Sequence, residues 1–177
     1  MCGYAPRARE ESVRPRRFGW RVWAAPQLKD YARALPVSLR HPLLPVVAMV
    51  AITAIVWARL YVQRIGEMRR RRIPPGDLAS SRQAASALRD VSAADNFRNL
   101  FEIPVLFYVF CGALYATQRQ DALVLGGCWL FVTLRAVHSA IHCTYNNVMH
   151  RFYVYLVSTV LLFALWVWFG IAIIAEA

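Results

Sequence analysis

The sequence predicts an all-α integral membrane protein in which four spans form a helical bundle. Hydrophobic residues make up 58% of the 177 residues and charged residues only 18%, whereas soluble domains are about 45–50% apolar and about 25% charged. The apolar residues gather in four runs of about 20 residues, the length that crosses a bilayer. Most of the charged residues lie outside these runs, and the length fits one domain.

The net charge of +11 is typical of proteins that bind nucleic acid or a membrane surface. The distribution of the basic residues along the chain distinguishes between these two classes. Most basic residues lie in residues 7–98, outside the long apolar runs. We therefore expect the lipid bilayer, and no nucleic acid, as a partner. Every basic residue except Lys29 is an arginine, which indicates a GC-rich, bacterial genome.

Residues 1–42 are basic and rich in proline, and they contain no apolar core of a secretory signal. We expect them to form a tail ahead of a membrane domain at residues 43–177. The first span is predicted at about residues 43–62, with Arg59 near its end, where a long side chain reaches the interface.

Further spans are predicted at about residues 93–117, 122–142 and 152–175. Ser92 to Asp95 has the pattern of a capping box, which would begin the second of the four spans. Pro104 lies inside that span and should kink its helix. A short helix is also expected at about residues 78–89.

Four spans place both termini on one side and the loops at 63–91 and 143–151 on the other. The arginines that follow the first span, Arg64 and Arg69–Arg72, outnumber the basic residues just before it. The positive-inside rule therefore predicts cytoplasmic loops in a bacterial inner membrane.

Ionisable residues inside membrane spans are costly and usually functional. The second span begins with Arg98, Asn99 and Glu102, whose spacing of three and four residues predicts one helix face. Glu102 has an alternative, purely structural interpretation, in which it neutralises Arg98 or Arg135 and pins the bundle together.

The third span carries Arg135, His138 and His142, which also share a predicted helix face. Both polar groups adjoin the predicted cytoplasmic loops, so they favour one net-positive cavity that would hold an anionic ligand. The two histidines could alternatively ligate haem or a metal. No Asp or Glu has metal-ligand spacing beside them, so we expect hydrogen-bonding histidines and no metal.

The segment from Asn96 to Pro104, with sequence NFRNLFEIP, resembles the signature that opens the second helix of the MAPEG family. These are the membrane-associated proteins of eicosanoid and glutathione metabolism. Arg135-Ala-Val-His138-Ser resembles the family motif of the third helix. Arg151 lies where some members keep an arginine that activates glutathione. By position alone it could also be an interfacial anchor.

The resemblance implies a homotrimer of four-helix subunits with glutathione bound between adjacent subunits. Arg98, Asn99 and Glu102 would hold its peptide and amine groups, and three more residues would line the pocket: Arg135, His138 and His142. Arg64 would reach in from a neighbouring subunit. Arg151 would be catalytic, since a fixed cation near the sulfur favours the thiolate.

The family chemistry would be that of a transferase or peroxidase acting on a lipophilic electrophile or hydroperoxide from the bilayer. The thiol could be glutathione or another low-molecular-weight thiol. Three positions depart from the family pattern: Asp95 replaces an arginine, His142 a tyrosine, and Phe152 a small hydroxyl residue. These departures keep open a non-catalytic membrane scaffold or lipid-binding trimer of the same fold.

Overall fold

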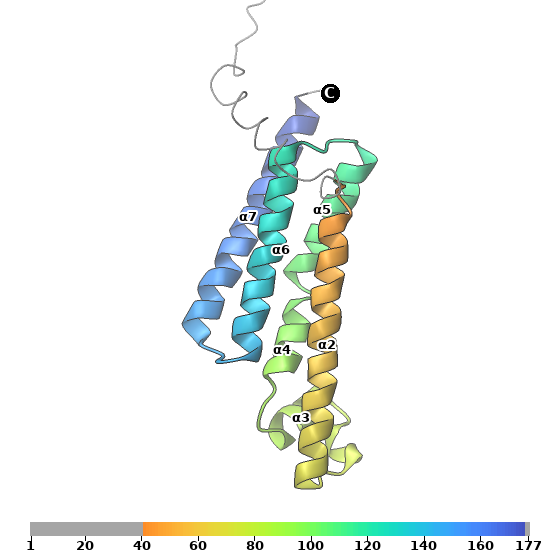
Figure 1. Cartoon of the computed structure of the whole chain (residues 1–177), viewed down its shortest axis with the longest axis vertical. Coiled ribbons are helices and arrows are strands. Elements are labelled where there is room, and N and C mark those ends of the chain that lie inside the picture. The colour runs from red at the N-terminus through yellow and green to blue at the C-terminus, as the bar shows by residue number, and fades with distance from the viewer. Residues whose placement is uncertain (1–40, 176–177) are drawn as a thin grey trace, which may run out of the picture.

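The computed structural model describes residues 41–175, which are entirely helical apart from turns and loops (Figure 1). Nearly all of the predicted tail at 1–42 therefore lies outside the described residues. The elements in chain order are α2 (Leu44–Arg71), η2 (Pro75–Leu78), α3 (Ser81–Ala87), α4 (Ser92–Asn99), α5 (Ile103–Ala116), α6 (Ala122–Cys143) and α7 (Val148–Ile174).

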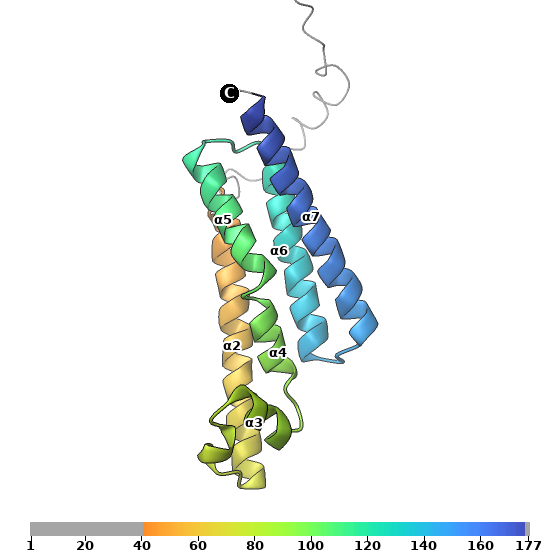
Figure 2. The same cartoon turned by 180° about the vertical axis from the view of Figure 1, so that it is seen from behind.

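Four stretches are long and apolar enough to cross a membrane, and they confirm the predicted fold class: Leu44–Arg71, Ser92–Ala116, Ala122–Cys143 and Val148–Ile174. The helices α6 and α7 form an antiparallel pair, while α4 and α5 follow one another along α2 (Figures 1 and 2). Buried aliphatic and aromatic side chains fill the interior, and the rings of Phe107 and Phe131 stack with centroids 4.6 Å apart.

The second membrane stretch is interrupted rather than merely kinked. α4 ends at Asn99 and α5 begins at Ile103, with Glu102 at ψ −96° between them. Pro104 follows at the start of α5, where its missing N–H removes the bond that a continuous helix would make to Leu100. Arg98 and Glu102 therefore do not share one continuous helix, and the predicted common face is wrong.

The predicted capping box at Ser92 is also wrong. Ser92 is the first residue of α4, and its backbone N–H donates to Asp90 Oδ1 at 2.9 Å. Partial burial of the Asp90 carboxyl opposes its ionisation, but hydrogen bonds from Ser92 and Gln63 and the charge of Arg59 together outweigh this and hold its pKa below the usual value. The capping box occurs instead at the short helix α3, between Ser80 and Gln83.

One buried carboxylate fastens the loop between α2 and α4. Glu67 is buried, and its Oε1 accepts a hydrogen bond from Arg71 Nη1 at 2.7 Å and from the Arg89 backbone N–H at 2.8 Å. Arg71 Nη1 also donates to the Ala87 carbonyl at 2.7 Å. This network holds the loop, including α3, against the end of α2.

Glu67→Ala is expected to lower the free energy of unfolding by about 1–3 kcal/mol, because it leaves Arg71 and the Arg89 N–H without their buried acceptor. Amide exchange at residues 88–91 should accelerate in the detergent-solubilised protein. Asp77→Ala, which removes an exposed carboxylate from the same loop, is the control. Equal amide exchange in Glu67→Ala and Asp77→Ala would contradict the role of Glu67 in holding the loop.

Candidate functional site

Three ionisable side chains of α6 are buried against its neighbours. Arg135 is 0% exposed, His138 2% and His142 1%. Their spacing places them on one face of α6, where the rings of His138 and His142 lie 5.8 Å apart. Burying such groups costs free energy unless they are paired, so their partners decide what the cluster can do.

Arg135 joins α6 to the end of α4. Its Nη2 donates to the Asn99 carbonyl at 2.8 Å. That carbonyl lies at the end of α4, where the helix supplies no further N–H groups. The Arg135 guanidinium also lies 5.1 Å from the centroid of the Tyr155 ring of α7, close enough for a cation–π interaction. Arg135 therefore links its own helix, α6, to both α4 and α7.

His138 and His142 both contact Arg151, at the start of α7. His138 Nδ1 is 3.0 Å from the Arg151 carbonyl, and a carbonyl only accepts, so this nitrogen carries a proton. His142 Nε2 is 3.1 Å from Arg151 Nη1. A guanidinium only donates, so His142 accepts there and is a neutral ring with its proton on Nδ1.

Four buried nitrogens of this cluster have no partner among the described residues: Arg135 Nε, Arg135 Nη1, His138 Nε2 and His142 Nδ1. The two arginine nitrogens and His142 Nδ1 are donors. A second buried cation beside Arg135 would be unfavourable, so the His138 ring is neutral and its Nε2 presents a lone pair. Buried polar groups of proteins are normally hydrogen-bonded. The cluster thus offers three donors and one acceptor to a ligand that carries oxygen acceptors and at least one N–H.

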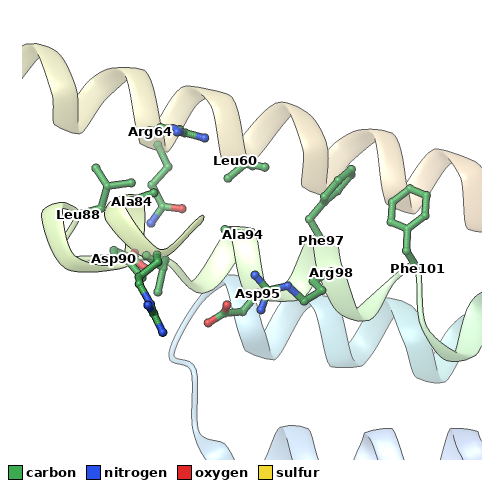
Figure 3. A pocket seen from close by; sticks show the side chains of 14 residues that line it. Leu60, Arg64, Ala84, Leu88, Asp90, Ala94, Asp95, Phe97, Arg98 and Phe101 are labelled. Carbon is green, nitrogen blue, oxygen red and sulfur yellow. The ribbon is translucent and has the colours of Figure 1, made fainter. Parts of the chain in front are cut away.

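Two other predicted site residues, Arg64 and Arg98, line a separate cavity of about 730 Å³ between α2, α3 and α4. Figure 3 shows Arg98 and Asp95 of α4 close together, while the rings of Phe97 and Phe101 point toward α2. Arg64 also donates to the Leu78 carbonyl at 2.6 Å. The lining is largely apolar, and its charged residues are three arginines and two aspartates: Arg64, Arg82, Arg98, Asp90 and Asp95.

Within one chain, the predicted site residues thus lie in two separate groups. Arg135, His138, His142 and Arg151 lie together, and Asn99 joins them through its carbonyl. Arg64 and Arg98 lie apart at the cavity. Glu102 is exposed at the helix break. Within residues 41–175 it forms no ion pair with Arg98 or Arg135, so the proposed neutralising pair is not formed.

Sequence reasoning missed a second buried polar contact, between α4 and α6. Asn96 is 0% exposed, and its Oδ1 accepts from Ser139 Oγ at 3.3 Å. The Asn96 amide also donates to Cys143 Sγ at 3.4 Å. The signal in the sequence is the pair of polar residues inside the two motifs, Asn96 in the first and Ser139 directly after His138 in the second.

Comparison with known families settles the relationship that these motifs suggest. The model of the MAPEG family matches residues 42–171, most of the chain. The chain belongs to the MAPEG family. No curated protein and no solved structure matches it significantly.

Membership of the MAPEG family and four apolar helices together make this an integral membrane protein. The MAPEG family is associated with glutathione in general, and membership fits a glutathione-related transferase, peroxidase or related activity. Among residues 41–175 there is no group of three His, Cys, Asp or Glu side chains that could hold a metal ion.

Arg135→Met should keep the free energy of unfolding within about 2 kcal/mol of wild type. The change removes two buried nitrogens that have no partner, Nε and Nη1, and orphans only the Asn99 carbonyl. Arg135→Ala, which also leaves a cavity, should lose more. Denaturant unfolding in detergent tests both. If Arg135→Met lowers the free energy of unfolding by much more than this, Arg135 stabilises the fold rather than binds a ligand.

Proposed function

We propose that this MAPEG protein is a glutathione-dependent transferase or peroxidase that acts on a lipophilic electrophile or hydroperoxide at the membrane. The observation that carries the proposal is the set of four buried, unpartnered nitrogens on Arg135, His138 and His142. A membrane protein that leaves such groups unpaired has a specific use for them, because they are costly there.

Glutathione fits the donors and the acceptor of this cluster. It carries two carboxylates, and arginine forks bind carboxylates through paired hydrogen bonds. Its peptide N–H groups and its ammonium can donate to the lone pair of His138 Nε2. The proposed binding residues are Arg98, Asn99, Glu102, Arg135, His138, His142 and Arg64. Another anionic low-molecular-weight thiol would satisfy the same chemistry.

Arg151 is the proposed catalytic residue. A free thiol has a pKa of about 8.5, and a fixed cation beside the sulfur favours the thiolate; each unit of lowering corresponds to about 1.4 kcal/mol. In a transfer reaction the thiolate forms a C–S bond as the electrophile accepts the electron pair. In peroxide reduction it cleaves the O–O bond, and a second thiol completes the disulfide.

The separation of the two groups of arginines in one chain supports a homotrimer with sites shared between subunits. Arg64 and Arg98 line one cavity, while the histidine cluster lies elsewhere. In the proposed trimer the cavity residues of one subunit complete the cluster of the next. We place this assembly in a bacterial inner membrane, with the loops at 63–91 and 143–151 cytoplasmic.

A non-catalytic scaffold or lipid-binding trimer is the second candidate. One observation favours it: none of Arg135, His138, His142 and Arg151 lines the large cavity in the single chain. A scaffold of this kind would keep the fold but would not bind a thiol in its thiolate form.

Thiol titration of the detergent-purified protein, followed by ultraviolet thiolate absorbance, separates the two candidates. Wild type should give a saturating thiolate signal with glutathione, and Arg151→Ala should lose most of it at neutral pH, because the cation is gone. Arg70→Ala is the charge-matched control, since it removes an exposed arginine at the end of α2.

An equal signal in wild type and Arg151→Ala would contradict the assignment of Arg151. No thiolate in wild type with any cellular thiol would favour the scaffold.

A further inference from the structure

The turn between α6 and α7 contains an asparagine held in an unusual backbone conformation. Asn146 has φ +46°, in the left-handed region that non-glycine residues seldom occupy. Its backbone N–H donates to the Ile141 carbonyl at 2.9 Å, across the end of α6. The backbone of this residue is therefore fixed to α6, and its side chain has a defined direction.

That side chain contacts Arg151. Asn146 Oδ1 accepts from Arg151 Nη1 at 2.8 Å, and His142 Nε2 accepts from the same nitrogen at 3.1 Å. A terminal guanidinium nitrogen has two N–H groups, so both donors of Nη1 are used. The other two nitrogens of Arg151, Nε and Nη2, have no partner among residues 41–175 and remain available to an anion.

We propose that Asn146 is a positioning residue, which orients the guanidinium of Arg151 so that its free N–H groups face the bound thiol. This inference rests on the proposed function and gives Asn146 a role that the family motifs do not assign. The backbone carbonyl of Arg151 is itself held by His138. The carbonyl and the side chain of Arg151 thus have separate anchors, and Asn146 supplies one of the two on the side chain.

The chemistry of the asparagine fits this role. A long arginine side chain loses rotamer entropy when it is fixed, and an anchor supplied by the protein removes part of that cost from binding. A carboxamide accepts a hydrogen bond without cancelling the positive charge. An aspartate here would accept the same bond but would place a negative charge beside the cation that stabilises the thiolate.

The test compares Asn146→Gly with wild type, because glycine removes the side chain and tolerates the left-handed backbone. Gln118→Gly is the matched control, since Gln118 also has a positive φ, +56°, in the turn between α5 and α6. The pKa of the bound thiol should rise by about one unit in Asn146→Gly, which is about tenfold less thiolate well below that pKa. Asn146→Asp should raise it too, with no loss of thermal stability.

A second measurement needs no thiol. Phenylglyoxal modifies accessible, unrestrained guanidinium groups, and mass spectrometry resolves each site. Arg151 should react several-fold faster in Asn146→Gly than in wild type or Gln118→Gly, with the other arginines as internal references. An unchanged Arg151 rate would overturn the positioning role whether or not a thiol binds.

The two readouts also separate this inference from the proposed function. Faster Arg151 modification in Asn146→Gly without any thiolate in wild type would refute the thiol chemistry and retain the positioning. A thiolate in wild type whose pKa is the same in Asn146→Gly would retain the chemistry and overturn the role of Asn146. A lower thermal stability of Asn146→Gly with both readouts unchanged would make Asn146 purely structural.

Discussion

The hydrogen bond from Arg135 to the Asn99 carbonyl is the interaction on which the arrangement of the site depends. It exists because the chain breaks between α4 and α5, just before Pro104, and leaves the Asn99 carbonyl without the N–H that a continuous helix would supply. In a bilayer such carbonyls must be satisfied by protein. Arg135 supplies one donor to α4, and this bond fixes the position of a guanidinium whose other N–H groups stay unpaired.

The same bond explains why the histidines lie where they do. With Arg135 fixed between α4 and the Tyr155 ring of α7, the face of α6 that carries it must point toward both helices. His138 and His142 follow on that face and reach Arg151 at the start of α7. A break in one helix thus sets the orientation of a second helix and the polar contacts of a third.

Much of the fold could be predicted from the sequence, because long apolar runs and their polar boundaries determine membrane helices directly. The short helix α3 and the interruption near Pro104 were also visible as local signals. The start of α4 could not be predicted in this way. The side chains of Ser92 and Asp90 can both accept a hydrogen bond from a backbone N–H at the start of a helix, and only the path of the preceding loop selects Asp90. Local patterns leave such choices open.

The site was predictable in its residue types but not in its grouping. Spacing along a helix predicts a common face only while the helix is continuous, so the break removed the argument for Arg98 and Glu102. On α6, which is unbroken, the same reasoning placed Arg135, His138 and His142 on one buried face. Asn96 was missed because a polar residue near the start of a helix is usually solvated. Here α6 covers it, and Ser139 bonds to it.

The unpaired nitrogens also limit which ligands the proposed site can hold. Since Arg135 is buried and cationic, a neutral ligand would leave its charge uncompensated in a low-dielectric region, whereas an anion would remove that cost. The lone pair on His138 Nε2 adds a second requirement, because a purely anionic group without a proton would leave it unpaired. A ligand with both a carboxylate and a nearby N–H meets both requirements, and a short peptide is the simplest molecule of that kind. Because these groups lie within membrane helices, a lipophilic second substrate can approach such a peptide from the bilayer without crossing water.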